Sequence, residues 1–202
     1  GVPEATEDVT LDSSIGNITA LPGALLPKGK RTITLKTDGE HNITIKSDNF
    51  KFVDSGYENL TLAVNTKPGA NGWVDLGANG FDMTYGVVNA NLDGNRLKFN
   101  VFKDNTAGSE FIIDNGASFV AGWQAELGNQ ATRMTLKGDS FLNAGNQITL
   151  KNKFQLTLVP TPDGVKNELL RIETTRTYAV TLTAKFIGSY AELGTQTLNF
   201  NY

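Results

Sequence analysis

The chain has 202 residues, with 18 basic and 21 acidic side chains and a formal net charge of −3. It contains no cysteine, which excludes a disulfide framework, a thiolate metal site and a cysteine nucleophile. Nucleic-acid binders carry a dense basic face, whereas the longest basic cluster here is residues 28–31, so we expect no nucleic-acid partner. No apolar run reaches 18 residues, so we predict no membrane-spanning helix.

Charged residues make up 19% of the chain, and glycine alone accounts for 21 residues. A composition rich in glycine, asparagine and threonine is typical of many short strands joined by tight turns. No linker rich in proline or serine divides the chain, and its length suits one large β-sandwich. We therefore predict a single all-β domain.

Alternation of apolar and polar residues recurs along the chain, and this period of two is typical of half-buried strands. Successive side chains of a strand point to opposite faces, so the apolar set is buried while threonine, lysine and asparagine face water. The predicted strands are Arg31–Lys36, Asn42–Lys46, Asn59–Asn65, Arg96–Phe102, Lys153–Val159, Arg176–Ile187 and Thr195–Tyr202.

Turn signals separate these strands, and Asp-Gly and Asn-Gly pairs supply the positive φ angles that hairpin turns require. The turn signals lie at residues 38–39, 67–69, 93–95, 115–116, 144–146 and 163–164, and those at 67–69 and 144–146 are Lys-Pro-Gly and Ala-Gly-Asn. This pattern predicts an antiparallel sheet, with Thr195–Tyr202 pairing antiparallel to Arg176–Ile187.

A short internal repeat covers residues 69–84, where Gly-Ala-Asn-Gly is followed first by Trp73 and then by Phe81. Glycine-and-aspartate repeats of similar length coordinate calcium in parallel β-helices, but two copies cannot build such a coil. We favour two successive Asn-Gly turns. Exposed aromatics can stack on sugar rings, which makes Trp73 and Phe81 candidate sugar-stacking residues. Trp123 alternates with Phe119 and Ala121, so we expect it in the core.

No arrangement of side chains in the sequence predicts a catalytic centre. His41 is the only histidine, and no Gly-x-Ser-x-Gly motif accompanies it. A glycosidase needs two carboxylates across a cleft, and no spacing selects such a pair. We predict a protein that is not an enzyme and that needs no metal ion or organic cofactor.

The C-terminal stretch, residues 185–202, resembles the end of bacterial chaperone–usher fimbrial (pilus) subunits. Those subunits close with a glycine about one strand before the end, then alternating apolar residues and an aromatic. Here these places are taken by Gly188, Leu198, Phe200 and Tyr202, although the aromatic is last rather than penultimate.

This resemblance implies an immunoglobulin-like antiparallel β-sandwich that lacks its final strand. It also implies an N-terminal extension, residues 1–16, that fills the groove of the next subunit, and a sandwich domain over residues 17–202. Strand addition of this kind uses main-chain hydrogen bonds for affinity and alternate side chains for specificity. The candidate donor-strand residues are Val9, Leu11, Ser13 and Ile15. An ordinary first strand of a closed sandwich is the alternative.

The leading hypothesis is a fimbrial structural or adhesin subunit on the bacterial cell surface, polymerised by donor-strand exchange. Its partners would be like or related pilus subunits, a periplasmic chaperone, an outer-membrane usher and a host glycan or receptor. The alternatives are a carbohydrate-binding β-sandwich module, a phage or surface-layer structural protein, and a glycosidase.

Overall fold

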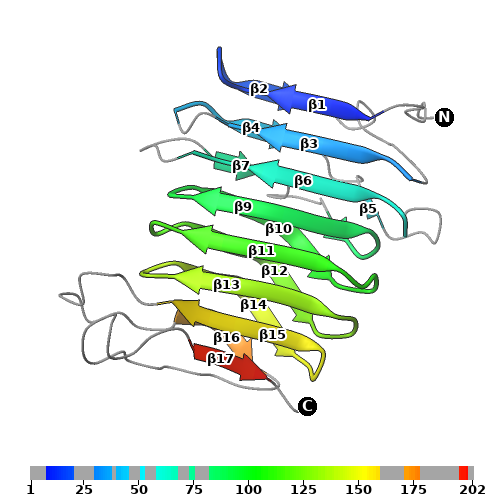
Figure 1. Ribbon diagram of the computed structural model, residues 1–202, viewed down its shortest axis with the longest axis vertical. Helices are drawn as coiled ribbons and strands as arrows, with labels where there is room; N and C mark the ends of the chain where they lie inside the picture. The colour runs from blue at the N-terminus through cyan, green and yellow to red at the C-terminus, as the bar shows by residue number, and fades with distance from the viewer. Residues whose placement is uncertain are drawn as a thin grey trace.

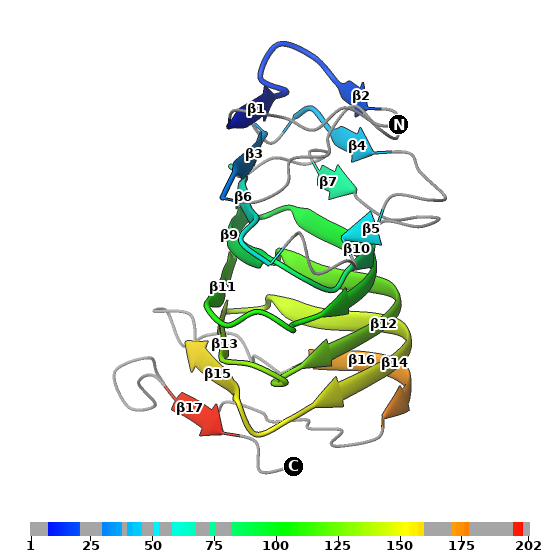
Figure 2. The same ribbon diagram turned by 90° about the vertical axis from the view of Figure 1, so that its right-hand side faces the viewer.

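The computed structural model describes residues 8–20, 30–37, 40–45, 51–52, 58–67, 73–75, 82–159, 171–177 and 196–199. These residues form strands and turns and include no helix, so none of them builds a helix that could cross a membrane. The strands make two sheets that face each other across a common core (Figures 1 and 2). The expectation of an all-β chain is confirmed.

One of the two sheets, which we call the flat sheet, runs along the whole stack as in Figure 1. Its described strands follow one another in chain order, with one strand of the other sheet between most successive pairs. They are β1 (Val9–Asp12), β3 (Thr32–Lys36), β6 (Thr61–Asn65), β9 (Val87–Asp93), β11 (Ser109–Asp114), β13 (Thr132–Lys137), β15 (Phe154–Val159) and β17 (Gln196–Asn199).

The other sheet, which we call the bent sheet, lies on the opposite side of the core in Figure 2. Its main path contains β2 (Ile18–Ala20), β4 (Ile43–Ile45), β7 (Trp73–Asp75), β10 (Arg96–Lys103), β12 (Ser118–Leu127), β14 (Phe141–Leu150) and β16 (Arg171–Thr177). Two short strands, β5 (Lys51–Phe52) and β8 (Asp82–Met83), also belong to this sheet. β8 pairs with the second half of β10, and β5 pairs with β8.

The chain is a parallel β-solenoid, because neighbouring strands within each sheet lie one full turn apart in sequence and run in the same direction. In the flat sheet Asn89 pairs with Glu110, Glu110 with Arg133, and Arg133 with Gln155, at steps of 21, 23 and 22 residues. Among the described strand pairs only β15 and β17 are antiparallel. The prediction of an immunoglobulin-like antiparallel β-sandwich is therefore wrong.

The misprediction has a physical cause in the one-sided burial of each sheet. Parallel sheets covered on both faces contain nearly continuous apolar runs, whereas each solenoid sheet has one face in the core and one in water. Its strands therefore alternate as antiparallel strands do; β9, for example, alternates between buried and more exposed residues along its length. Alternation alone does not distinguish the two folds.

The predicted turns at residues 93–95 and 115–116 connect the two sheets instead of reversing the chain within one sheet. Gly94, Gly116 and Gly138 have φ angles of 72°, 73° and 63° between a flat-sheet strand and the bent-sheet strand that follows. The positive φ values predicted at residues 93–95 and 115–116 are present, but each turn is a corner of the solenoid.

The long strands of the bent sheet bend near their middle. Phe99 of β10 pairs with Ala121 of β12, yet Val101 pairs with Gln124, so β12 has one extra residue at the bend. β14 has two residues at the same place, Gly145 and Asn146. They lie between Ala144 and Gln147, which pair with Ala121 and Gln124 of β12. An extra residue of this kind is a β-bulge, which bends a strand and increases its local twist. The bend gives the solenoid a third outer face, which β8 extends beside residues 101–102 of β10.

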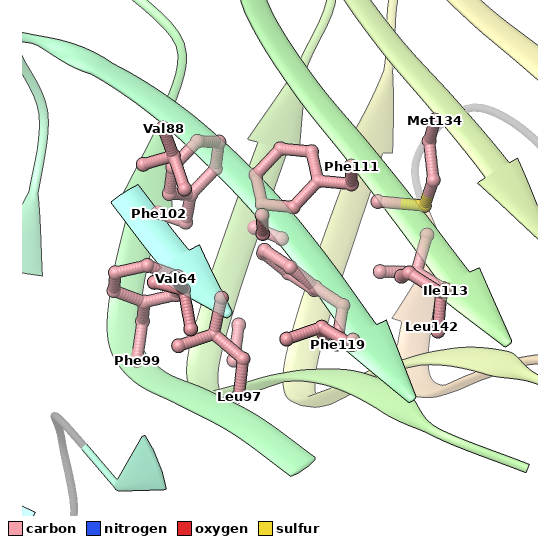
Figure 3. Close-up of a cluster of buried hydrophobic side chains, with 14 of the residues drawn as sticks. Val64, Val88, Leu97, Phe99, Phe102, Phe111, Ile113, Phe119, Met134 and Leu142 are labelled. Carbon is pink, nitrogen blue, oxygen red and sulfur yellow. The ribbon is translucent and has the colours of Figure 1, made fainter. Parts of the chain in front are cut away.

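Apolar side chains of successive turns stack between the sheets and form one core (Figure 3). At its centre the rings of Phe99, Phe102, Phe111 and Phe119 pack with centroids 5.2–5.8 Å apart. Tilted and edge-to-face aromatic pairs at such separations stabilise a core beyond their buried area, by about 0.5–1.5 kcal/mol each. Phe111 of the flat sheet thus packs against Phe102 and Phe119 of the bent sheet and joins the two sheets at the centre of the core.

The C-terminal strand closes the flat sheet at one end of the stack. β17 pairs antiparallel with β15, with Leu198 opposite Leu156, while β16 lies in the bent sheet beside β14. The predicted pairing of Thr195–Tyr202 with Arg176–Ile187 is wrong for the described residues, because their partners lie in different sheets. Residues 178–187 lie outside the described residues.

The bend depends on glycine at position 145. A Cβ atom there would lie 2.1 Å from the backbone oxygen of Gly122, so Gly145→Ala must displace one turn from the next. We expect this substitution to lower the free energy of unfolding by about 1–3 kcal/mol, measured by urea denaturation.

Gly16→Ala is the matched control, because a Cβ at Gly16 meets no atom within 4 Å. Equal unfolding free energies for the two variants would contradict the close approach of the turns at the bend.

Candidate functional site

The outer face of the flat sheet carries a regular grid of side chains, because the sheet is in register from turn to turn. Asn89 of β9, Glu110 of β11 and Arg133 of β13 are consecutive partners in one row, and all three are exposed. In the next row Asn65 of β6 pairs with Asn91 of β9, which pairs with Ile112 of β11. Neighbours along a row are separated by the strand spacing of about 4.7–4.9 Å.

Two adjoining hollows mark the middle of this face. One, of about 300 Å³, is lined by Asn65, Asn89, Ala90, Asn91, Glu110 and Ile112. The other, of about 260 Å³, is lined by Asn89, Gly108, Ser109, Glu110, Ala131 and Arg133. They share Asn89 and Glu110, so they form one shallow surface of mixed character, which we call the amide face and define by Asn65, Asn89, Asn91, Glu110, Ile112 and Arg133.

The amide face combines hydrogen-bonding groups of both kinds with little net charge. Each asparagine offers two N–H donors and a carbonyl acceptor, and Glu110 adds two acceptor oxygens. The Arg133 Nε lies 3.8 Å from the Glu110 Oε2, with 72% and 47% of the two side chains exposed. An exposed pair of this kind contributes little to stability, so both groups are available to a ligand. Ile112, half-buried between the polar groups, adds an apolar spot.

A second unusual surface lies at the bend of the bent sheet. Trp123 is 53% exposed, although alternation with Phe119 and Ala121 predicts it in the core. At the bulge Gly122 and Trp123 are both exposed and Gln124 is half-buried, so Trp123 faces solvent although Ala121 and Ala125, two positions before and after it, are buried. The core prediction for Trp123 is wrong for this reason.

A buried carboxylate holds the corner after β10. Asp104 is 1% exposed and accepts hydrogen bonds from Gly128 N (2.6 Å), Asn129 N (3.0 Å) and Thr132 Oγ1 (2.6 Å). Its donors all belong to the next turn, so this side chain fastens one turn of the solenoid to another. Burial raises the pKa of Asp104, and the three hydrogen bonds only partly offset this effect.

Beside that corner, Lys151 Nζ lies 2.8 Å from both Glu126 Oε1 and Asn129 Oδ1. Burial alone would raise the pKa of Glu126, but the hydrogen bond and charge of Lys151, with smaller contributions from Asn129 and Lys103, lower it. Asp104, Glu126 and Lys151 thus join consecutive turns and are explained by the fold. In the part of the chain that the structure describes, no three histidine or carboxylate side chains cluster as a metal site would require.

The predicted site residues near the N-terminus lie in and beside β1, which pairs parallel with β3 of the same chain. Val9 and Leu11 are half-buried against the core, and Ser13 is buried, with its Oγ 3.4 Å from both the Lys36 and the His41 carbonyl oxygens. Ile15 lies in the turn after β1 and is 96% exposed. The four residues therefore do not share one face.

The other predicted site residues are spread over the molecule. Trp73 is half-buried in β7, with the Arg96 guanidinium 5.4 Å from its ring centroid, so one face of the indole is covered by a cation. Leu198 lies in β17. Phe81, Gly188, Phe200 and Tyr202 lie outside the described residues. The amide face was missed, because its residues come together only through a step of about one turn between strands.

No protein-family model, no curated protein and no solved structure matches this chain. The fold and the outer faces are therefore the basis for a functional assignment.

The two carboxylates at the corner should affect stability in opposite directions as the pH changes. Asp104 has a raised pKa in the folded protein, so its contribution to stability is full below about pH 3.9 and is lost as the pH rises through the folded value. Glu126 has a lowered pKa, so its contribution is present above about pH 4.3 and is lost as the pH falls through the folded value.

Unfolding free energies of the wild type, Asp104→Asn and Glu126→Gln between about pH 3 and about pH 7 measure both effects. The advantage of wild type over Asp104→Asn should shrink as the pH rises, and its advantage over Glu126→Gln should grow. Two differences that change with the same sign would contradict the pKa directions.

Proposed function

We propose that the chain is a carbohydrate-binding β-solenoid that holds a neutral or weakly charged saccharide on the amide face without catalysing a reaction. The observation that carries this proposal is the hollowed, in-register grid of Asn65, Asn89, Asn91 and Glu110 on the flat sheet. An extended saccharide presents hydroxyl groups at regular intervals along its length. The rows Asn65–Asn91 and Asn89–Glu110 place donors and acceptors of successive turns side by side along the same direction.

The chemistry of the amide face favours a saccharide over an anion or a nucleic acid. Arg133 is paired with Glu110, so no unbalanced cluster of positive charge is available to bind phosphate. Both hollows are shallow, and the one at Asn65 and Asn91 is mainly polar, whereas sites for small apolar ligands are concave and mostly apolar. Ile112 supplies an apolar contact for the C–H groups of a sugar ring.

Hydrolysis of the bound saccharide is less well supported than binding. Asp93 and Asp114 are Cα partners on β9 and β11, which makes them a candidate carboxylate pair among the described residues of this sheet. The Asp114 Oδ1 accepts from Asn115 N at 2.8 Å, and the Asp93 Oδ1 accepts from the Asn115 side chain. These hydrogen bonds form the corner turn and do not span a cleft.

The bacterial cell surface remains the predicted location. A glycan-binding solenoid could belong to a fimbria or to a surface layer. Donor-strand exchange is not part of this proposal, because it presupposes a sandwich with a missing strand. In this chain β1 is already a strand of its own flat sheet.

A glycan array followed by titration calorimetry tests the proposal. The double substitution Asn89→Ala with Asn91→Ala should weaken binding of the best saccharide at least about tenfold, because it removes two adjacent amides from the hollow.

The matched control is Asn105→Ala with Asn152→Ala, which removes two exposed asparagines that lie off the amide face. Equal affinities of the two double variants, or no saccharide bound by the wild type, would contradict the proposal.

A further inference from the structure

We infer that Trp123 is a second saccharide-stacking site, at the bend of the bent sheet and separate from the amide face. This inference rests on the proposed carbohydrate-binding function and extends it to another side of the solenoid. Trp123 and Ile15 are the exposed large apolar side chains among the described residues, and Trp123 alone of the two belongs to a strand.

Trp123 lies at a β-bulge of the bent sheet, and this bulge places its side chain on the surface. β12 and β14 each have two residues at the bend where β10 has one, so Gly122 and Trp123 of β12 lie level with Gly145 and Asn146 of β14. Bulges are conserved features that re-aim side chains. Here the bulge turns a tryptophan outward from a strand whose apolar neighbours Ala121 and Ala125 remain buried.

The surface beside the Trp123 indole is formed by the backbone of two glycines. Gly122 and Gly145 are both exposed, and the approach of their two turns leaves no room for a Cβ on Gly145. No side chain therefore rises from these two positions next to Trp123. A flat ligand can lie over the indole and across the two glycines, whereas a larger residue at position 145 would narrow this surface.

Four neutral amides lie around Trp123 at the bend, with Arg176 of β16 as the partner of Gln147 and Asp82 of β8 as the partner of Val101. Asn100 of β10 and Asn146 of β14 occupy the bend on either side of Trp123, and Gln124 and Gln147 are partners directly after it. The Asn100 Nδ2 donates to Asp82 Oδ1 at 2.8 Å, which fixes the orientation of that amide.

An indole surrounded by amides suits the C–H face of a sugar ring, whose hydroxyl groups then reach the amides. A cation over a single exposed aromatic ring gains only a small free energy of binding. The carboxylate of Asp82 already accepts the Asn100 hydrogen bond. The ligand class that fits is therefore a neutral oligosaccharide.

Tryptophan fluorescence tests this inference directly. In a Trp73→Phe background the emission reports Trp123 alone, since the chain has two tryptophans. Cellohexaose, xylohexaose, maltohexaose and chitohexaose are titrated into this protein. We expect at least one of them to change the emission with saturation, and Trp123→Ala in the otherwise native chain to lose that binding in calorimetry at least about tenfold.

The amide-face variant separates the two sites. If Asn89→Ala with Asn91→Ala leaves the Trp123 emission change intact, the bend is an independent site, as we infer. If a saccharide binds and Trp123→Ala leaves its affinity unchanged, the inference is wrong and the amide-face proposal stands. If only Trp123→Ala weakens binding, the amide-face proposal is wrong and the inference stands. If none of the four probes binds, the inference is wrong.

Discussion

The parallel stacking of one turn on the next is the interaction on which the rest of this structure depends. Each strand hydrogen-bonds to strands one turn before and after it, so residues about 22 positions apart become neighbours. The same register stacks Phe111 on Met134 and Phe119 on Leu142 inside the core. Side chains such as Asp104 then fasten the corners by reaching into the next turn. A defect in one turn is therefore transmitted to its neighbours, whose hydrogen bonds and core contacts it shares.

Register also determines what the outside of the molecule can do. A side chain on an outer face has neighbours from the turns before and after it. Functional groups are therefore arranged in rows that follow the long axis of the solenoid. Asn65 beside Asn91, and Asn89 beside Glu110, are rows of this kind. Such rows form shallow extended surfaces instead of deep pockets, which favours long polar ligands over small compact ones. The bend adds an outward-facing tryptophan, because Gly122 and Trp123 both leave the core there before Ala125 returns to it.

Much of the local structure could be predicted from the sequence. The predicted strands Arg31–Lys36, Asn59–Asn65 and Lys153–Val159 correspond closely to β3, β6 and β15. The arrangement could not be predicted from alternation, since a one-sided parallel sheet and an antiparallel sandwich show the same period of two. A signal was nevertheless present: the turns at residues 93–95, 115–116 and 138–139 recur at about one solenoid turn. The short repeat at residues 69–84 concealed this longer period. The amide face and the outward position of Trp123 follow from register and from the bulge, neither of which a strand pattern contains.

Cysteine cross-linking tests the parallel register most directly, because the native chain has no cysteine. Thr135 and Thr157 are Cα partners on β13 and β15, and neighbouring strands lie within the range that a disulfide spans. An antiparallel hairpin through residues 138–140 would instead place Thr135 opposite Asn143, which belongs to the bent sheet. The solenoid predicts that Thr135→Cys with Thr157→Cys forms an intramolecular disulfide under mild oxidation, detected by mass spectrometry, while Thr135→Cys with Asn143→Cys does not. Rapid closure of the second pair and failure of the first would contradict the solenoid.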